Sequence, residues 1–353
     1  MKEIIPLWVK KIPSTAYIEV PNDFIRLDLA INKYPASQKV MEIMKNNLNK
    51  VNLYPDTNWS ILVKKLADYN KINNKQILIT NGLEEAIDII TRFFLKEGEK
   101  ALTLIPTYSQ FYVAALRQKA KAIAIEYIEN QDFKIPVEKI KELAKRENVK
   151  LVWLCNPNNP TGTVFEREDI LSIIKDADYA VVVDECFYEF CGETVIDLID
   201  KFSNLIVLRS FSKSFSLAGI RFGYIATNEE IIDSLLRLRQ PSSVNALAQY
   251  AALASLDDLD YYKNIWNKIR HERENLKNEL QNLGFKVFSS GTNFLYAKIN
   301  NAESIFKKLW DNKIFVFPSW DPEFIGGKKE YLRILVGLRK ENKILVDTLK
   351  KII

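Results

Sequence analysis

The sequence contains few of the residues that build disulfide frameworks and metal sites. Among its 353 residues there are three cysteines and one histidine, and no cysteine has metal-ligand spacing with His271. So sparse and odd a set of cysteines is typical of a protein from a reducing compartment. We therefore expect no metal ion and no disulfide framework, and we expect the protein to lie in the cytoplasm.

The sequence also lacks a strong charge bias and long apolar runs. Lys and Arg number 50 and Asp and Glu 45, so the net charge is +5, and no dense basic block indicates a nucleic-acid partner. No window approaches the roughly 20 apolar residues of a membrane span. The N-terminal MKEIIPLWVKKIPSTAY is too broken by Lys and Pro for a signal peptide. We expect neither nucleic acid nor a membrane as a partner.

Glycine is scarce as well, with 11 residues in the whole chain. A chain with less than half the usual glycine content of about 7% is expected to keep glycine where the backbone needs it. Five of these glycines fall in segments that also gather Asn, Asp, Ser, Lys and Arg, namely Gly82, Gly162, Gly219, Gly223 and Gly337. These segments are candidates for a functional site.

Short apolar runs alternate with helical patterns through the middle of the chain. The runs are nearly continuous in apolar residues, which is typical of strands buried on both faces of a sheet. Between them, apolar residues recur at helical spacing, as in 83–97. The alternation predicts an α/β fold with a mostly parallel sheet flanked by helices. The predicted strands are 76–80, 100–105, 149–155, 179–184, 204–209 and 221–226.

After about residue 250 the pattern changes. It predicts a long helix over 258–282, and then further short elements that indicate a smaller α+β unit. The length is that of about two domains, and we predict a large domain over 36–250 and a small domain made of 1–35 plus 251–353. The later elements are strands near 293–299 and 331–336 and helices near 302–312 and 340–352.

Polar residues follow four of the predicted strands. In open α/β sheets, ligands bind outside the carboxyl ends of the strands, so these residues are expected to meet at one rim of the sheet. They are Asn81-Gly82, the NPNNPTG segment at 156–162, Asp184-Glu185 and the SFSK segment at 210–213.

Part of this set is suited to phosphate. Gly82 lets the backbone approach a ligand closely and precedes a predicted helix, whose free N–H groups form an anion site. Ser210, Ser212 and Arg221 add hydroxyl and guanidinium donors. We therefore predict a phosphate group at this end of the rim.

The rest of the set is suited to an aldehyde and a pyridinium ring. The amine of Lys213, desolvated near cations, becomes a nucleophile for carbonyls. Asp184 ends a buried strand and needs a cationic partner to stay ionised. Phosphate, aldehyde and pyridinium together describe pyridoxal 5′-phosphate, which we predict as the cofactor.

The combination of NPNNPTG with SFSK and an arginine eight residues after the lysine is highly specific. On these motifs the sequence resembles the fold-type I pyridoxal-phosphate enzymes, in the histidinol-phosphate aminotransferase branch. The resemblance implies a homodimeric aminotransferase that acts on histidinol phosphate, or a similar amine, and 2-oxoglutarate in histidine biosynthesis. The other matching segments, in the family's order, are NGLEEAI (81–87), PTY (106–108), DECFYEF (184–190) and YLRILVGLRKEN (331–342).

The resemblance also implies a role for each matching residue. Lys213 would bond to the cofactor aldehyde and move the substrate proton, and Asp184 would pair with the ring nitrogen. Arg333 would bind the anionic group of the substrate. The remaining roles fall to Asn159 at the phenolic oxygen, Tyr108 on the ring face, Gly82, the Leu83 backbone, Ser210, Ser212 and Arg221 at the phosphate, Tyr54 at the phosphate of a neighbouring subunit, and Asn32 in the substrate segment.

Two features resemble a different branch, the threonine-phosphate decarboxylases. Phe187 stands where the family usually has a tyrosine donor, and PSSVNALAQ at 241–249 is similar to a decarboxylase segment. Against this reading, the decarboxylases' HGG segment is absent. The N-terminal aminotransferase motif is degraded as well, with Lys33 in place of an acidic residue. Decarboxylation of L-threonine O-3-phosphate in cobalamin biosynthesis therefore stays open as the alternative.

A cofactor-binding protein without turnover is a third reading. Regulators of this fold carry an additional DNA-binding domain. We expect no room for such a domain in 353 residues.

Overall fold

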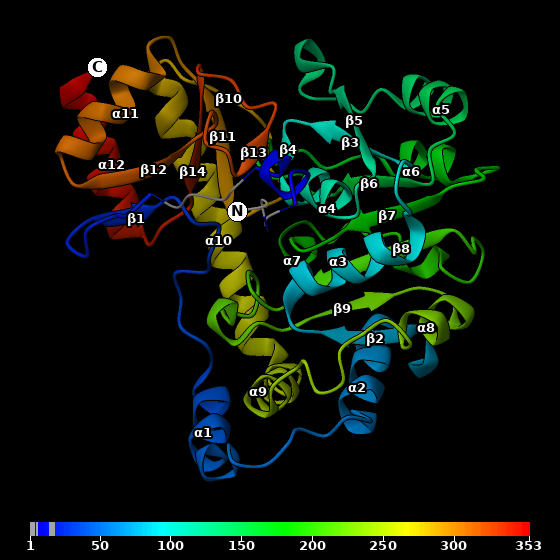
Figure 1. Cartoon of the computed structure of the whole chain (residues 1–353). Helices are drawn as coiled ribbons and strands as arrows, with labels where there is room; N and C mark the ends of the chain where they lie inside the picture. Colours follow the sequence, from blue (N-terminus) through cyan, green and yellow to red (C-terminus); the bar gives the residue numbers. More distant parts are fainter. Residues whose placement is uncertain (1–3, 5, 14–17) are drawn as a thin grey trace.

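The computed structural model describes residue 4, residues 6–13 and residues 18–353. Its larger sheet has seven strands, which are β2 (Ile77–Thr80), β3 (Lys100–Ile105), β5 (Lys121–Glu126), β6 (Leu151–Cys155), β7 (Ala180–Asp184), β8 (Leu205–Ser210) and β9 (Gly223–Ala226). They lie in the order β2–β9–β8–β7–β6–β3–β5 (Figure 1). β9 runs antiparallel to its two neighbours, and the other pairs are parallel.

The strands of the larger sheet are buried on both faces, as their apolar sequences predict. In β6, Leu151, Trp153 and Cys155 belong to one apolar cluster, and Val152 and Leu154 belong to another. This alternation follows from the two-residue period of a strand. A parallel sheet needs such cover on both faces, because helices connect its strands on either side.

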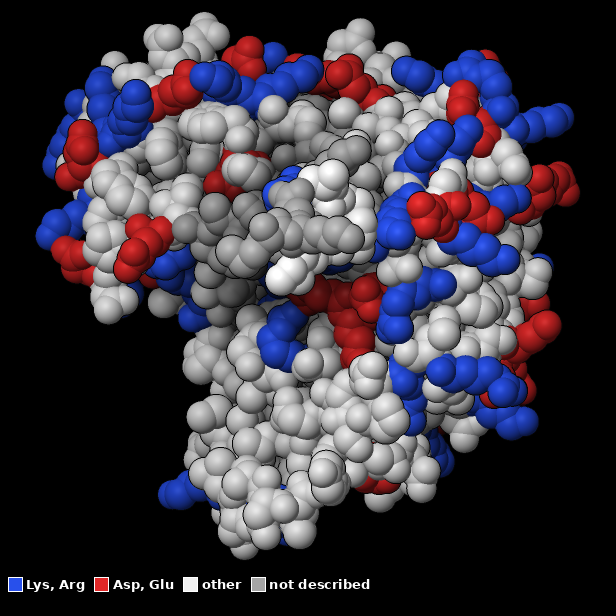
Figure 2. Space-filling model, viewed as in Figure 1, with Lys and Arg blue, Asp and Glu red and all other residues white. Residues whose placement is uncertain are grey.

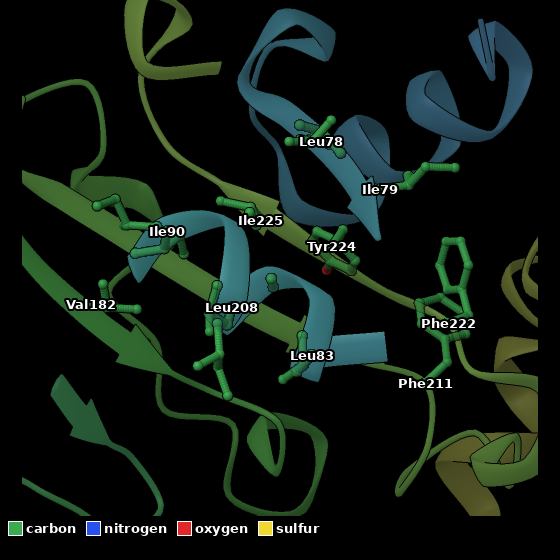
Figure 3. Packing of buried hydrophobic residues seen from close by; sticks show 14 of the residues in the cluster. Leu78, Ile79, Leu83, Ile90, Val182, Leu208, Phe211, Phe222, Tyr224 and Ile225 are labelled. Carbon is green, nitrogen blue, oxygen red and sulfur yellow. The ribbon is translucent and has the colours of Figure 1, made fainter. Parts of the chain in front are cut away.

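Helix α3 (Gly82–Phe94) shows how one face is covered. Its residues Leu83 and Ile90 lie over Leu208 of β8 and Ile225 of β9 (Figure 3). The helix begins directly after β2, so its N-terminus meets the carboxyl edge of the sheet. Other helices of this part of the chain are α1 (Gln38–Asn46), α2 (Ser60–Asn70), α4 (Gln110–Arg117), α5 (Val137–Arg146), α6 (Arg167–Ile174), α7 (Tyr188–Cys191), α8 (Glu229–Leu235) and α9 (Ala246–Leu256).

A second sheet has five strands, which are β1 (Ile25–Leu27), β10 (Lys286–Val287), β11 (Phe294–Lys298), β12 (Ile314–Pro318) and β14 (Tyr331–Leu335). They lie in the order β1–β12–β14–β11–β10. Because β1 pairs in parallel with β12, the N-terminal segment joins a sheet formed otherwise by the C-terminal part of the chain. The helices here are α10 (Leu259–Asn282), α11 (Ala302–Asp311) and α12 (Arg339–Ile352).

Two elements connect the sheets. Tyr262 and Trp266 of α10 pack into a core cluster of the larger sheet, whereas Leu276 and Leu280 of the same helix pack beside the smaller sheet. A two-stranded ladder joins β4 (Thr107–Tyr108) to β13 (Phe324–Ile325). We keep the predicted domains, 36–250 and 1–35 plus 251–353, as a proposal in which α10 forms the connection.

The predicted α/β alternation agrees with the elements observed, to within a few residues at most boundaries. The strands that were not predicted are β1, β4, β5, β10, β12 and β13. β5 lies at the edge of its sheet and leaves Ala124 exposed, so its sequence lacks a continuous apolar run. Short 3-10 helices complete the chain at Val9–Lys11, Leu48–Lys50, Asn74–Gln76, Glu129–Gln131, Ile196–Leu198 and Ala218–Ile220. No helix in the described parts of the chain is long and apolar enough to cross a membrane.

Candidate active site

A cavity of about 450 Å³ lies at the carboxyl ends of β6, β7 and β8, where the smaller sheet faces the larger one. Most of the predicted site residues line it. They are Leu83, Tyr108, Asn159, Asp184, Ser210, Ser212, Lys213, Arg221 and Arg333. The structure therefore brings together segments that are up to 250 residues apart, since Leu83 and Arg333 line the same cavity.

Asp184 is a buried carboxylate at the end of β7. Its side chain accepts a hydrogen bond from the backbone N–H of Cys186 at 3.0 Å. Among the described residues no Lys or Arg forms an ion pair with it, and burial raises the pKa of Asp184 to about 6. An acid in this position favours a cationic ligand group, because a cation would offset the cost of burying the charge.

Lys213 follows β8 and reaches the same cavity. Burial lowers the pKa of its amine, and the nearby Arg333 guanidinium lowers that pKa further. A neutral amine is a nucleophile and a proton acceptor. The environment of Lys213 therefore suits both attack on a carbonyl and transfer of a proton.

The predicted phosphate end is built around the N-terminus of α3. Gly82 has a φ of +73°, and a Cβ at this position would lie 2.6 Å from Nη2 of Arg221. Only glycine leaves room there for the guanidinium and the first amides of the helix. Nη1 of Arg221 donates to Ser212 Oγ at 3.4 Å, and the Ser212 N–H donates to Ser210 Oγ at 3.1 Å. These contacts hold the guanidinium of Arg221 and the hydroxyls of Ser210 and Ser212 close together beside the N-terminus of α3.

Glu84 also lies at this end, and the sequence interpretation gave it no role. Its carboxylate pairs with Nη2 of Arg221 and accepts a hydrogen bond from the Tyr108 hydroxyl at 3.4 Å. A phosphate that binds Arg221 would therefore either displace the Glu84 carboxylate or share Arg221 with it.

Arg333 of β14 lies at the opposite end of the cavity and is 1% exposed. It donates to Oδ1 of Asn159 at 2.6 Å and to the backbone carbonyl of Asp28 at 2.6 Å. Through the first of these bonds it fixes the orientation of the Asn159 amide, whose NH₂ group then remains as a donor. Arg333, predicted to bind the substrate, is thus in direct contact with Asn159, predicted to bind the cofactor.

Three predicted residues, Gly82, Asn32 and Tyr54, are not among those that line the cavity, although Gly82 directly precedes Leu83, which does. Asn32 is buried beside it, where its amide donates to the backbone carbonyl of Ser214 at 3.2 Å. Tyr54 is 91% exposed and lies in a separate cavity of about 280 Å³ with Trp59 and Tyr250. The predicted reach of Tyr54 into a neighbouring subunit stays a prediction.

Other residues of the cavity were missed by the sequence interpretation. Arg26 and Asp28 of the N-terminal segment form a two-point ion pair at 2.7 and 2.6 Å. Glu323, in the loop before β13, lies 3.5 Å from Nη1 of Arg333. The spacing of Arg26 and Asp28 could have revealed the first pair, because residues two positions apart in an extended segment point to the same side. Nothing in the local sequence marks Glu323, because only the fold brings it to Arg333.

Phe187, the departure from the family pattern, lines the cavity and is 1% exposed. Its ring meets Phe294 edge to face, with centroids 5.3 Å apart. Aromatic packing thus replaces a hydroxyl donor at this point of the wall.

The fold brings together in one cavity a lysine whose pKa is lowered, a buried acid without a cationic partner, and a group of donors at a helix N-terminus. This combination is typical of the class of pyridoxal-phosphate enzymes. The chain belongs to the aminotransferase class I and II family, whose sequence profile matches residues 25–349.

Individual relatives support this assignment. The chain is 38% identical over 318 residues to a histidinol-phosphate aminotransferase from Caldanaerobacter subterraneus subsp. tengcongensis, covering 88% of this chain and 89% of that protein. It is similar to the crystal structure of the histidinol-phosphate aminotransferase from Clostridium acetobutylicum, with a TM-score of 0.85, 27% identity and coverage of 93% and 98%. It is also similar to L-threonine-O-3-phosphate decarboxylase from Porphyromonas gingivalis, with a TM-score of 0.79, 25% identity and coverage of 93% and 98%.

These matches confirm the predicted family, the α/β fold class and the enzyme class, a pyridoxal-phosphate-dependent aminotransferase. The roles of individual residues stay predictions. The structure bears on them through position alone, since it places most of them around one cavity.

Proposed function

We propose that this protein transfers the amino group of histidinol phosphate to 2-oxoglutarate, with pyridoxal 5′-phosphate held in the cavity described above. One observation supports this most. A buried carboxylate without a cation, a partly buried amine of lowered pKa and a buried guanidinium, on Asp184, Lys213 and Arg333, converge on the same cavity. The relatives named above are histidinol-phosphate aminotransferases that match almost the whole chain.

The residues present fit the cofactor. The Asp184 carboxylate offers the counter-charge for a pyridinium nitrogen. The glycine at position 82 leaves space beside Arg221, so a phosphate could bind there by displacing the Glu84 carboxylate or by sharing Arg221 with it. Asn159 would donate to the phenolic oxygen. When bound, pyridoxal phosphate supplies an aldehyde for the substrate amine and a ring that delocalises the electron pair released at Cα.

The protein's own groups would then control the protons. Asp184 keeps a proton on the ring nitrogen, because the buried carboxylate gains from a cation beside it. The Lys213 amine would accept the proton from Cα of the substrate and return it to C4′ of the cofactor. Its lowered pKa favours the neutral form that this step requires.

Arg333 would hold the anionic group of the substrate. Its guanidinium is buried, and its Nε has no hydrogen-bond partner among the described residues. Such an unsatisfied donor favours an anionic ligand, because burial without a partner is unfavourable. A substrate fixed at this end presents its amine toward Lys213.

The proposed assembly is a homodimer. Apolar side chains are exposed at the end of the molecule formed by α1, the following turn and α2, where Figure 2 shows few charged side chains. Contiguous apolar surface of this kind is typical of an interface. The exposed members are Met41, Leu48, Val51, Leu53, Tyr54 and Ile61. Tyr54 on this surface would then lie near the cavity of the partner subunit.

The proposed location is the cytoplasm. The three cysteines are free, at positions 155, 186 and 191. Free thiols of this kind are typical of a reducing compartment.

A second candidate function is decarboxylation of threonine phosphate. Two observations favour it. Phe187 keeps a hydroxyl away from the cavity wall, and the structure is similar to the Porphyromonas gingivalis decarboxylase over 93% of the chain. Both reactions use the same lysine. They differ in which substrate bond lies perpendicular to the ring, and that is set at the Arg333 end.

A half-reaction on the cofactor-loaded protein tests the proposal. Histidinol phosphate and threonine phosphate are added separately, while cofactor absorbance, glutamate formed after addition of 2-oxoglutarate, and carbon dioxide are measured. We expect glutamate from the first substrate and no carbon dioxide from the second. Carbon dioxide from threonine phosphate without any need for 2-oxoglutarate would support the second candidate instead. Inactivity with both would contradict both.

A further inference from the structure

Arg333 is a cation in apolar surroundings. Its guanidinium carbon lies 4.6, 4.9 and 5.3 Å from the ring centroids of Phe317, Phe324 and Phe294. A charge removed from water to this extent needs a counter-charge, because ring faces offset only part of the lost hydration.

Glu323 supplies that counter-charge. Its Oε1 lies 3.5 Å from Nη1 of Arg333, and its side chain is 23% exposed. Two other carboxylates act on Arg333, those of Asp28 and Asp321. The Asp28 carboxylate is held by two nitrogens of Arg26 at 2.7 and 2.6 Å, so Asp28 offers Arg333 only its backbone carbonyl. Asp321 accepts from the Glu323 N–H at 2.8 Å and forms no ion pair with Arg333 in the described structure. Within the described chain, Glu323 is therefore the residue whose carboxylate pairs with Arg333.

The backbone of Glu323 makes two hydrogen bonds, whereas its carboxylate makes one long contact, with Arg333. The Glu323 N–H donates to Oδ1 of Asp321 at 2.8 Å, and its carbonyl accepts from the Ser109 N–H at 2.8 Å. The next residue pairs with Tyr108 in the β4–β13 ladder. At 3.5 Å the contact with Arg333 is long for a charge-assisted hydrogen bond. The carboxylate can rotate away without any movement of the loop.

We propose that Glu323 is a specificity-determining residue, the resting counter-ion of Arg333 that the anionic group of a substrate must displace. The inference rests on the proposed role of Arg333 as the substrate anion site. Both side chains line the cavity, so a bound anion competes with the Glu323 carboxylate for Arg333 and stays close to that carboxylate after displacing it. Two like charges at such separations repel strongly in a partly buried site, and a doubly charged group is repelled about twice as much as a singly charged one.

Glu323 therefore disfavours anions in proportion to their charge. It weakens the binding of a phosphate dianion, such as that of the proposed substrate histidinol phosphate, more than the binding of a singly charged carboxylate, such as the one at the far end of 2-oxoglutarate. A site with the same arginine and a neutral residue at position 323 would bind phosphates better.

Binding of two amine-free anions to the cofactor-loaded protein tests this. Butyrate carries one charge, and n-propyl phosphate carries about two at pH 8. Titration calorimetry gives their Kd for the unaltered protein, for Glu323→Gln and for Glu330→Gln, a control that removes the same charge from an exposed residue. We expect Glu323→Gln to bind propyl phosphate about tenfold tighter and butyrate about threefold tighter, with Glu330→Gln within about twofold of the unaltered protein.

Unchanged or weaker anion binding in Glu323→Gln would overturn the proposal, as would an equal gain in Glu330→Gln. Glu323→Asp draws the carboxylate back by one methylene and keeps its charge. It should give part of the gain, and it serves as the test if the glutamine variant does not fold. Arg333→Ala separates the two claims. If it leaves anion binding unchanged, the proposed role of Arg333 fails. If it abolishes binding while both Glu323 variants are unchanged, only the role of Glu323 fails.

Discussion

The two ends of the cavity solve the problem of buried charge in opposite ways. At the cofactor end, Asp184 is buried without a cation, and its pKa is raised to about 6. At the substrate end, the buried charges have ionic or polar partners: Arg26 pairs with Asp28, and Arg333 contacts Asn159 and Glu323, with only its Nε unsatisfied. The contrast is between a buried acid that has no counter-charge and a buried arginine that has one.

This difference fits the two kinds of ligand. A cofactor that remains bound can be part of the folded structure, so an uncompensated Asp184 is tolerated because the bound ring would neutralise it. A substrate leaves in every cycle. Residues at its end must be stable both with and without it, which internal ion pairs provide.

The largest expected effect is the loss of turnover when the lysine at the cofactor end is removed. Lys213→Ala would remove both the proposed covalent attachment and the proposed proton carrier, so turnover should fall by about 10⁴-fold or more. Lys201→Ala, an exposed lysine outside the cavity, should leave turnover within about twofold of the unaltered protein. Steady-state rates with histidinol phosphate measure both. Substantial activity in Lys213→Ala would remove the basis of the mechanism.

The next largest effect is a loss of folding stability when the buried ion pair next to the cofactor end is broken. Arg209 and Glu185, which adjoin Ser210 and Asp184, form an ion pair of 2.8 Å with side chains 2% and 0% exposed. Glu185→Ala leaves Arg209 buried without its partner and should lower the free energy of unfolding by about 3–5 kcal/mol. Asp68→Ala breaks the exposed pair with Lys64 and should lower it by about 0.5 kcal/mol or less. Denaturant unfolding measures both, and equal losses would contradict the account.

A third prediction compares the two buried acids. Because the folded-state pKa of Asp184 lies above its ordinary value of 3.8, ionisation of Asp184 destabilises the cofactor-free protein, fully so above about pH 6 and not at all below pH 3.8. Asp184→Asn should therefore stabilise the cofactor-free protein at pH 8 by up to about 3 kcal/mol, and the gain should vanish near pH 4. It should also weaken cofactor binding.

Asp28→Asn is the counterpart at the substrate end. Asp28 is 1% exposed but paired with Arg26, so its substitution should lower stability at pH 8 by about 1 kcal/mol or more. Unfolding at both pH values measures the comparison. A loss of stability in both variants at pH 8 would contradict the distinction between the two ends.

The smallest expected effect is that of Phe187→Tyr. The added hydroxyl must fit where the Phe187 ring packs against Phe294. We expect a change in cofactor affinity of less than about tenfold and a small loss of stability, because a buried hydroxyl needs a partner. Equilibrium binding of pyridoxal phosphate measures the first. A large gain in affinity would show that the missing donor limits the site.

The cofactor end could be predicted from the sequence because its residues follow strands directly. Asp184 ends β7 and Lys213 comes three residues after β8 ends, so the rule that ligands bind at strand ends was sufficient to bring them together. Arg333 was reached only through the family motif. Glu323 could not be predicted, since it lies in a loop whose path depends on the ladder between β4 and β13.

Local sequence patterns also predicted only part of the fold. Continuous apolar runs such as that of β7 were sufficient for the inner strands, whereas β5, half-exposed at the edge, was not recognised. Pairing of β1 with β12 depends on contacts between residues almost 290 positions apart, which no local pattern records.

The attachment site of the cofactor is the most direct test of the whole account. The protein loaded with pyridoxal phosphate is treated with borohydride, which fixes any bond between the cofactor and a lysine, and is then digested and mapped by mass spectrometry. We predict the added mass on the peptide that contains Lys213 and on no other lysine among the 50 basic residues. Stoichiometric labelling of a different lysine, or none with the cofactor bound, would contradict the central claim that the partly buried amine at the end of β8 is the reactive group.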